Sequence, residues 1–201
     1  MNINWYGKSF FQITTQKAKK SNIELLIEPF IKDDNIKVPK IKADIVIQKN
    51  ESDPQEVGGD YFSILNPGEY EIGGVFIQKL DYKKGQALCL IEAENIRVCY
   101  LKELKGEDIT SDDLSLISGV DILIISTESI KLVPQIEPKI VIPMNSCFSG
   151  KDSKKESEDS LNRFLKIMGA SSVEAIPKLS IKSRDFSSEN GIEVVALTPK
   201  N

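Results

Sequence analysis

Histidine is absent from this sequence of 201 amino acids. Histidine is the commonest neutral metal ligand, and it is the side chain whose unperturbed pKa suits proton transfer near neutral pH. Its absence excludes Ser-His-Asp triads, Cys-His dyads, HExxH metalloprotease sites and every histidine general base. Any enzyme built on this chain therefore has to use carboxylates, lysine, tyrosine or cysteine, or a hard cation such as Mg²⁺ bound through oxygen.

Cysteine is scarce as well. The three cysteines, Cys89, Cys99 and Cys147, are odd in number and lack CxxC spacing. Both a disulfide framework and a thiolate zinc cluster are therefore disfavoured. We expect reduced and mostly buried thiols.

Long apolar runs and blocks of one charge sign are also missing. No run approaches the roughly 20 apolar residues that span a bilayer, and the first residues do not form a signal peptide. We therefore expect a cytoplasmic protein with no membrane partner. The 26 basic and 30 acidic residues are scattered and give a net charge of -4, which argues against a nucleic-acid partner.

The sequence does contain many short apolar runs of the β type, and 40% of its residues are hydrophobic. This content and the length predict a single domain over residues 1–201. Strands are expected at residues 2–6, 10–15, 23–27, 43–48, 61–65, 75–80, 87–93, 96–101, 121–126, 139–143, 173–176, 179–182 and 193–197.

Two helices are expected among the strands of the second half. The first covers residues 111–118, with Ser111 as its N-cap. The second covers residues 160–168 and follows a charged, solvated loop at residues 151–159. Helices interspersed with many strands indicate an α/β or α+β layered architecture.

Six phrases follow one another in an order that resembles a known family. They are, with the most specific first, residues 67–75 (PGEYEIGGV), 3–11 (INWYGKSFF), 27–30 (IEPF), 43–46 (ADIV), 120–124 (VDILI) and 138–144 (PKIVIPM). Together they are similar to the metallo-β-lactamase superfamily, in its small lactonase-like branch of zinc-dependent hydrolases. The resemblance covers nearly the whole chain. It implies an α/β (α+β) fold, a four-layer αβ/βα sandwich of two mixed β-sheets with outer helices and a site at the sheet edges.

The metal-binding positions of that family have lost their ligands in this chain. The matching positions are, in chain order, Asn50, Ser52, Pro54, Gln55, Lys83, Glu103 and Asn145. Only Glu103 keeps a carboxylate, and an ammonium at Lys83 would repel a divalent ion about 4 Å away by several kcal/mol. We therefore expect no zinc and no cofactor. Lys83 and Glu103 are expected either to pair across the vestigial pocket, in the space of the lost metal, or to extend into solvent as charged residues at loop ends usually do. Residues 102–105 are predicted to form a polar loop.

Two further sites stay open from the residues alone. The carboxylates of Glu51, Asp53, Glu56 and Asp60 could bind a hard cation, although a solvated acidic loop is the expected structure. Cys147 lies two residues beyond the family's last ligand position, so it could face the pocket as a nucleophile. The lack of a histidine base disfavours that role.

Three hypotheses on function follow. The first is a catalytically inactive relative, a pseudoenzyme, that acts in binding or as a scaffold. The second is a residual hydrolase of lactones, phosphodiesters or thioesters, with a zinc-free site around Glu103, Lys83 and Cys147. The third is a structural subunit of a hetero-oligomer with an active relative. The partner is an unidentified small molecule or protein, and a homo-oligomer is a further alternative.

Overall fold

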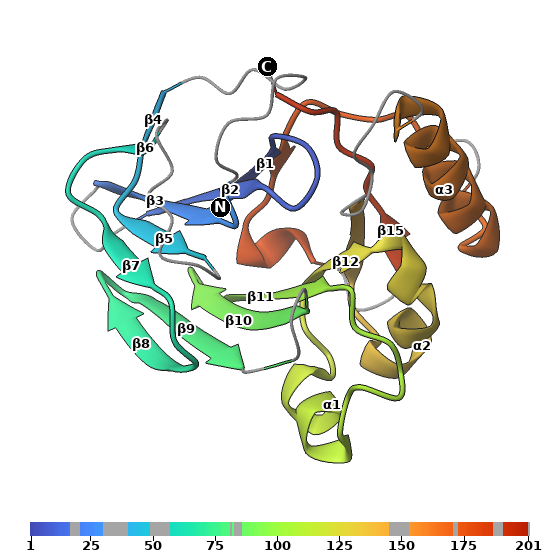
Figure 1. The fold of residues 1–201 in the computed structure, drawn as a ribbon, viewed down its shortest axis with the longest axis horizontal. Helices are drawn as coiled ribbons and strands as arrows, with labels where there is room; N and C mark the ends of the chain where they lie inside the picture. Colours follow the sequence, from blue (N-terminus) through green and yellow to red (C-terminus); the bar gives the residue numbers. More distant parts are fainter. Residues whose placement is uncertain are drawn as a thin grey trace.

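The computed structural model describes residues 1–16, 21–29, 40–48, 57–80, 82, 86–144, 153–170, 173–186 and 191–200. Of residues 153–157 only the backbone is described. Two large β-sheets face one another, and the helices lie to one side of them (Figure 1). The mixed-sheet sandwich expected from the sequence is therefore confirmed.

The first sheet has six strands and mixed pairing. In spatial order they are β14 (Leu179–Ser180), β1 (Asn2–Trp5), β2 (Phe11–Gln16), β3 (Asn22–Ile27), β5 (Ile45–Ile47) and β7 (Phe62–Ile64). The pairs from β14 to β3 are antiparallel, whereas β3, β5 and β7 run parallel to one another. A small parallel pair, β4 (Ile41–Lys42) and β6 (Val57–Gly58), forms a separate ladder.

The second sheet has seven strands. In spatial order they are β15 (Glu193–Val194), β13 (Ile140–Met144), β12 (Ile122–Ser126), β11 (Ile96–Lys102), β10 (Ala87–Ala93), β9 (Val75–Leu80) and β8 (Gly68–Ile72). The strands from β15 to β11 are parallel, and those from β11 to β8 are antiparallel. The strand β12, apolar except for Ser126, fits here because both faces of this sheet are covered.

Three hydrophobic clusters account for the layers. The largest lies between the two sheets and contains side chains such as Ile3, Ile45, Ile91 and Tyr100. A second cluster packs the outer face of the second sheet against the helices. A third cluster lies on the first sheet and includes side chains of the small β4–β6 region. The alternation of side chains along each central strand thus supplies both faces of a sheet.

The helices of the described chain are α1 (Ser111–Ile117), α2 (Val133–Ile136) and α3 (Ser153–Ile167), with 3₁₀ turns η1 (Thr127–Leu132) and η2 (Ser183–Asp185). All three α-helices contribute buried side chains to the cluster on the second sheet. No helix in these parts of the chain is long and apolar enough to cross a membrane.

Several boundaries differ from the sequence-based expectation. The N-cap of α1 is Thr110, not Ser111, because Thr110 and Asp113 hydrogen-bond each other's backbone N–H groups. The loop expected at residues 151–159 is wrong for residues 153–159, since α3 begins at Ser153. The Lys and Glu residues there are good helix formers, and the buried Phe164 and Leu165 anchor the helix.

The strand pattern needs two further corrections. Residues 68–72 form the edge strand β8, which the Pro-Gly turn signal before it had hidden. Residues 173–176 form no strand, apart from a single bridge between Ile176 and Leu197. The turn and helix at residues 127–136 were not predicted either, because they carry no apolar periodicity long enough to detect.

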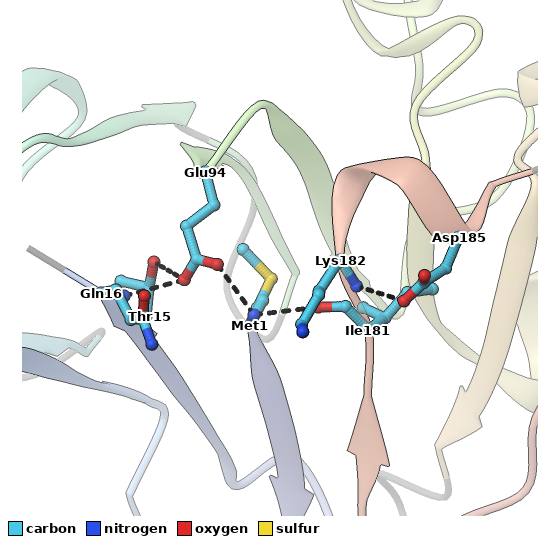
Figure 2. A network of polar contacts seen from close by, with 7 residues as sticks. All are labelled: Met1, Thr15, Gln16, Glu94, Ile181, Lys182 and Asp185. Carbon is cyan, nitrogen blue, oxygen red and sulfur yellow. Dashed lines mark hydrogen bonds and ion pairs between the residues drawn. The ribbon is translucent and has the colours of Figure 1, made fainter.

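A polar network fastens one end of the sandwich (Figure 2). The carboxylate of Glu94, in the β10–β11 turn, accepts hydrogen bonds from Thr15 Oγ1 at 2.6 Å and the Gln16 backbone N–H at 2.8 Å. It also pairs with the α-ammonium of Met1 at 3.0 Å, which donates further to the carbonyl of Ile181. Burial alone would raise the pKa of Glu94, but these bonds outweigh it and lower that pKa. The network joins both sheets at the end opposite to the candidate site.

Candidate functional site

The carboxyl ends of the parallel strands of both sheets gather at the other end of the sandwich. In the first sheet these are the ends of β3, β5 and β7, and in the second sheet those of β11, β12 and β13. Open α/β sheets place their ligands in the crevice outside such strand ends. We call this end of the sandwich the strand-end mouth.

A lysine of the second sheet reaches across the mouth to a carboxylate of the first. Lys102 is the last residue of β11, and two-residue alternation puts it on the same inner face as Tyr100. Its ammonium pairs with Glu28 Oε2 at 2.6 Å. Glu28 follows β3 directly and has a left-handed backbone conformation, with φ of 47°. The side chains are only 16% and 13% exposed, so this pair is largely shielded from water.

A second lysine makes a similar crossing from the neighbouring part of the second sheet. Lys79 lies on β9, on the inner face together with Ile77. Its ammonium donates to the backbone carbonyl of Gln48, just after β5, at 2.9 Å, and also to that of Leu65, just after β7. Three strand ends of the first sheet therefore each present an oxygen to an ammonium. We call Lys79, Lys102 and their three acceptor residues the two-lysine bridge.

Buried groups lie beneath the bridge on the same inner face. Cys89 pairs with Lys79 on one side and with Tyr100 on the other in the strand register. Burial raises the pKa of the Cys89 thiol to about 12, an effect that the Lys79 ammonium opposes and the Glu28 carboxylate reinforces. The thiol is therefore protonated at neutral pH and is neither a nucleophile nor a ready metal ligand.

Tyr100 is the other buried polar group under the bridge. Burial raises the pKa of its phenol well above the usual value, and the charges of Glu28 and Glu103 add to that effect. Its hydroxyl donates to the carbonyl of Ser9 at 3.2 Å. Tyr100 therefore stays neutral and serves as a hydrogen-bond donor within the protein.

A small pocket opens beside the bridge, with a volume of about 140 Å³. Its walls come from both sheets, and its described lining consists of Glu28, Leu65, Pro67, Lys79, Leu80, Tyr82, Gln86 and Ala87. Aliphatic side chains and polar groups thus line one concave space. Sites for small molecules combine apolar walls with a few polar groups in this way.

Of the site residues expected from the sequence, the structure describes Glu103 alone. It follows Lys102 with φ of 55° and is partly buried. The other vestigial positions and the candidate nucleophile lie outside the described residues: Asn50, Ser52, Pro54, Gln55, Lys83, Asn145 and Cys147. Pairing between Lys83 and Glu103 therefore stays a prediction. Of the proposed acidic cation site only Asp60 is described, and it is exposed.

The two-lysine bridge was not predicted from the sequence. Lys102 was assigned to a polar loop, which is wrong, because it ends β11 and its side chain is mostly buried. The missed signal was the alternation from Tyr100 to Lys102, which continues the apolar inner face of the strand into a charged residue. Nothing local to Lys102 identifies Glu28, which is 74 residues away in the chain.

The described residues at the mouth do not fit a zinc ion. Zinc takes histidine nitrogen, thiolate sulfur or carboxylate oxygen, usually four ligands in all. The described residues contain no group of three or more His, Cys, Asp or Glu side chains able to hold a metal. At the mouth, the Glu28 carboxylate is paired with an ammonium, and the strand-end carbonyls of Gln48 and Leu65 receive another. At these described oxygens the positive charge comes from lysine.

Comparisons with known proteins agree with this architecture. Residues 2–145 match the family described as "Beta-lactamase superfamily domain". A proposed zinc-dependent hydrolase of the metallo-β-lactamase superfamily from Thermotoga maritima superposes with a TM-score of 0.73 at 23% identity, over 98% of this chain and 100% of that one. A comparison with curated protein sequences finds no match.

Two further solved structures share the fold at lower similarity. The metallo-β-lactamase fold protein YhfI of Bacillus subtilis has a TM-score of 0.56 at 10% identity, over 98% of this chain and 96% of that one. The diiron β-hydroxylase CmlA of Streptomyces venezuelae has a TM-score of 0.52 at 10% identity, over 90% of this chain and 54% of that one. The family match and the shared sandwich lead to one conclusion: this chain belongs to the metallo-β-lactamase superfamily.

Proposed function

We propose that this chain is a metal-free member of the superfamily that binds a ligand or partner at the strand-end mouth and does not hydrolyse it. The observation that carries the proposal is the two-lysine bridge, in which Lys102 and Lys79 supply positive charge to oxygens at three strand ends. A divalent ion placed among these ammonium groups would be repelled. The oxygens at the strand ends already have a positive partner within the chain, so they need no metal.

The sequence supports the same proposal independently. The chain has no histidine, and the positions that resemble the zinc-binding motif of the lactonase-like branch carry Asn50, Ser52, Pro54 and Gln55. Metal affinity falls when the residues that bind the metal are lost, and also when the groups that orient those residues are lost. Fold alone does not fix activity, so we base the proposal on the site.

The alternative of a residual hydrolase rests on Glu103, Lys83 and Cys147. Of these three residues, the structure describes Glu103 alone. The described residues of the mouth include no histidine that could serve as the base of a cysteine nucleophile. The alternative of a structural subunit beside an active relative is compatible with the same mouth. Native mass measurements on the purified protein, alone and with such a relative, separate it from a stand-alone binding role.

An activity panel tests the proposal directly. Purified protein is assayed with a γ-lactone, a phosphodiester and a thioester, each in chelator-treated buffer and with added Zn²⁺. We expect rates that equal the buffer blank in every case, since the described residues of the mouth form no metal-binding group that could activate water. Saturable turnover without metal would support the residual hydrolase instead, with Cys147→Ser and Glu103→Gln as the variants that locate it. Zinc-stimulated turnover would contradict both.

A further inference from the structure

The pocket beside the two-lysine bridge contains a buried acceptor without a donor. The amide Oε1 of Gln86, one of its lining residues, is buried and makes no hydrogen bond within the described structure. A buried polar atom left unpaired loses the hydrogen bond that water gives it in the unfolded chain. Such an atom in a native protein calls for a physical explanation, and an absent ligand is one.

The orientation of the Gln86 amide follows from its neighbours. Its Nε2 donates to Asp108 Oδ2 at 2.8 Å, and the same oxygen accepts the backbone N–H of Lys105 at 3.0 Å. An ionised carboxylate only accepts hydrogen bonds, so the opposite orientation of the amide would bring Oε1 against another acceptor. The amide is therefore fixed with its nitrogen on Asp108 and its oxygen unpaired.

Other polar groups around the pocket also favour a ligand that donates hydrogen bonds. Glu28 uses Oε2 for Lys102, while Oε1 accepts no hydrogen bond from the described residues. The hydroxyl of Tyr82 is already donated to Asp113 Oδ2 at 2.7 Å. Within the described structure, Glu28 and Gln86 each keep an acceptor without a donor, whereas the side-chain donors of Tyr82 and Lys79 already serve protein oxygens.

We propose that this pocket binds a small molecule that has hydrogen-bond donors at one end and an apolar body, such as a primary amine or a primary amide. The donors would meet the oxygens of Glu28 and Gln86, while the body would contact Leu65, Pro67, Leu80 and Ala87. The proposal rests on the proposed function, since it places a ligand where the superfamily's resemblance implies a metal.

Size and charge narrow the class further. A pocket of about 140 Å³ holds a molecule of roughly five to ten non-hydrogen atoms. Negative groups lie close to it: Asp108 and Asp113 sit behind Gln86 and Tyr82, and both add to burial in raising the pKa of Tyr82. Lys79 and Lys102 bring positive charge to the same site, but both ammonium groups already donate to protein oxygens. A carboxylate ligand would therefore meet mainly acceptors in the described lining, whereas an amide or an ammonium would supply the missing donors.

Ligand-detected NMR on the full chain tests the proposal with four matched probes. These are butylammonium, butyramide, butyrate and butanol, which share the same carbon skeleton and differ in the polar end. We expect butylammonium and butyramide to bind with dissociation constants in the millimolar range, as tiny ligands do. Butyrate should not bind, and butanol should bind more weakly because it offers a single donor.

Two glutamine variants make the test specific. Gln86→Leu should weaken the binding of both nitrogen probes by about fivefold or more, on the scale of one hydrogen bond. Gln135→Leu, at an exposed position of α2, should leave binding unchanged. The amine and amide arms show whether the ligand is charged or neutral. Equal binding of butyrate, or binding that survives Gln86→Leu, would overturn the inference.

The outcome is separable from that of the proposed function. If no probe binds and the protein neither hydrolyses the panel substrates nor contains metal, the ligand class is wrong while the metal-free mouth stands. If metal is found at the mouth, both fail. As a further readout, butyramide should raise the unfolding midpoint of the wild-type chain, since ligands that bind only the folded state stabilise it.

Discussion

Replacing Lys102 by methionine is expected to lower the free energy of unfolding by about 2–4 kcal/mol. Methionine keeps most of the aliphatic length of lysine, so the main loss is the ammonium. Glu28 would then be left as a mostly buried carboxylate without its cation, since its side chain is only 13% exposed. Chemical denaturation of the two proteins, with slope and midpoint both measured, gives the difference.

A double-mutant cycle separates the ion pair from other effects of the substitution. Glu28→Gln removes the charge and keeps the shape, so Lys102→Met combined with Glu28→Gln should be less destabilised than Lys102→Met alone. We expect a coupling of about 1–3 kcal/mol. Additive costs would mean that the two side chains do not interact in solution.

A second lysine pair provides the control for burial. Lys139 pairs with Asp121 at 2.7 Å, but the lysine side chain is 49% exposed. Its replacement by methionine should cost less than about 1 kcal/mol, as is usual for exposed ion pairs. An equal cost for Lys102→Met and Lys139→Met would show that the mouth confers no special environment on its lysine.

Replacing Lys79 by methionine is the second substitution for which we expect a large effect, about 1–3 kcal/mol of lost stability. The carbonyls of Gln48 and Leu65 both receive hydrogen bonds from this ammonium, so one substitution removes a donor from two strand ends. Because those strand ends belong to β5 and β7, hydrogen exchange should become faster there first.

The control for Lys79 is a lysine without such a role. Lys166 is exposed in the last turn of α3. Lys166→Met should leave both the unfolding free energy and the exchange of the first sheet nearly unchanged. Should Lys79→Met behave like Lys166→Met, the crossing hydrogen bonds would contribute nothing to holding the sheets together.

Sequence patterns predicted the sheets better than the helices. Strands such as β10 and β12 carry apolar runs bounded by turn residues, and these are local signals. The start of α3 was misplaced because a run of Lys, Glu and Asp looks like a loop when its periodicity is ignored. Its anchors, Phe164 and Leu165, lie near the far end of the helix.

For the site, the sequence predicted only that the zinc ligands of the family are missing. The absence of histidine indicated this, because a residue count requires no knowledge of the structure. The pairing of Lys102 with Glu28 could not be predicted from the sequence, because the two residues are 74 positions apart and join two different sheets. The pairing of Lys83 with Glu103 stays a prediction. In the described chain, Lys79 and Lys102 place positive charge at the mouth.

Metal analysis of the purified protein tests the central claim most directly. The chain is expressed in medium with added Zn²⁺, Fe²⁺ and Mn²⁺, purified without chelator and measured by elemental mass spectrometry against protein concentration. The account predicts far less than one equivalent of any of these metals per chain, because lysine ammonium groups occupy the strand-end mouth and no histidine is present. One equivalent of zinc, iron or manganese per chain, lost on mutation of the mouth, would contradict it.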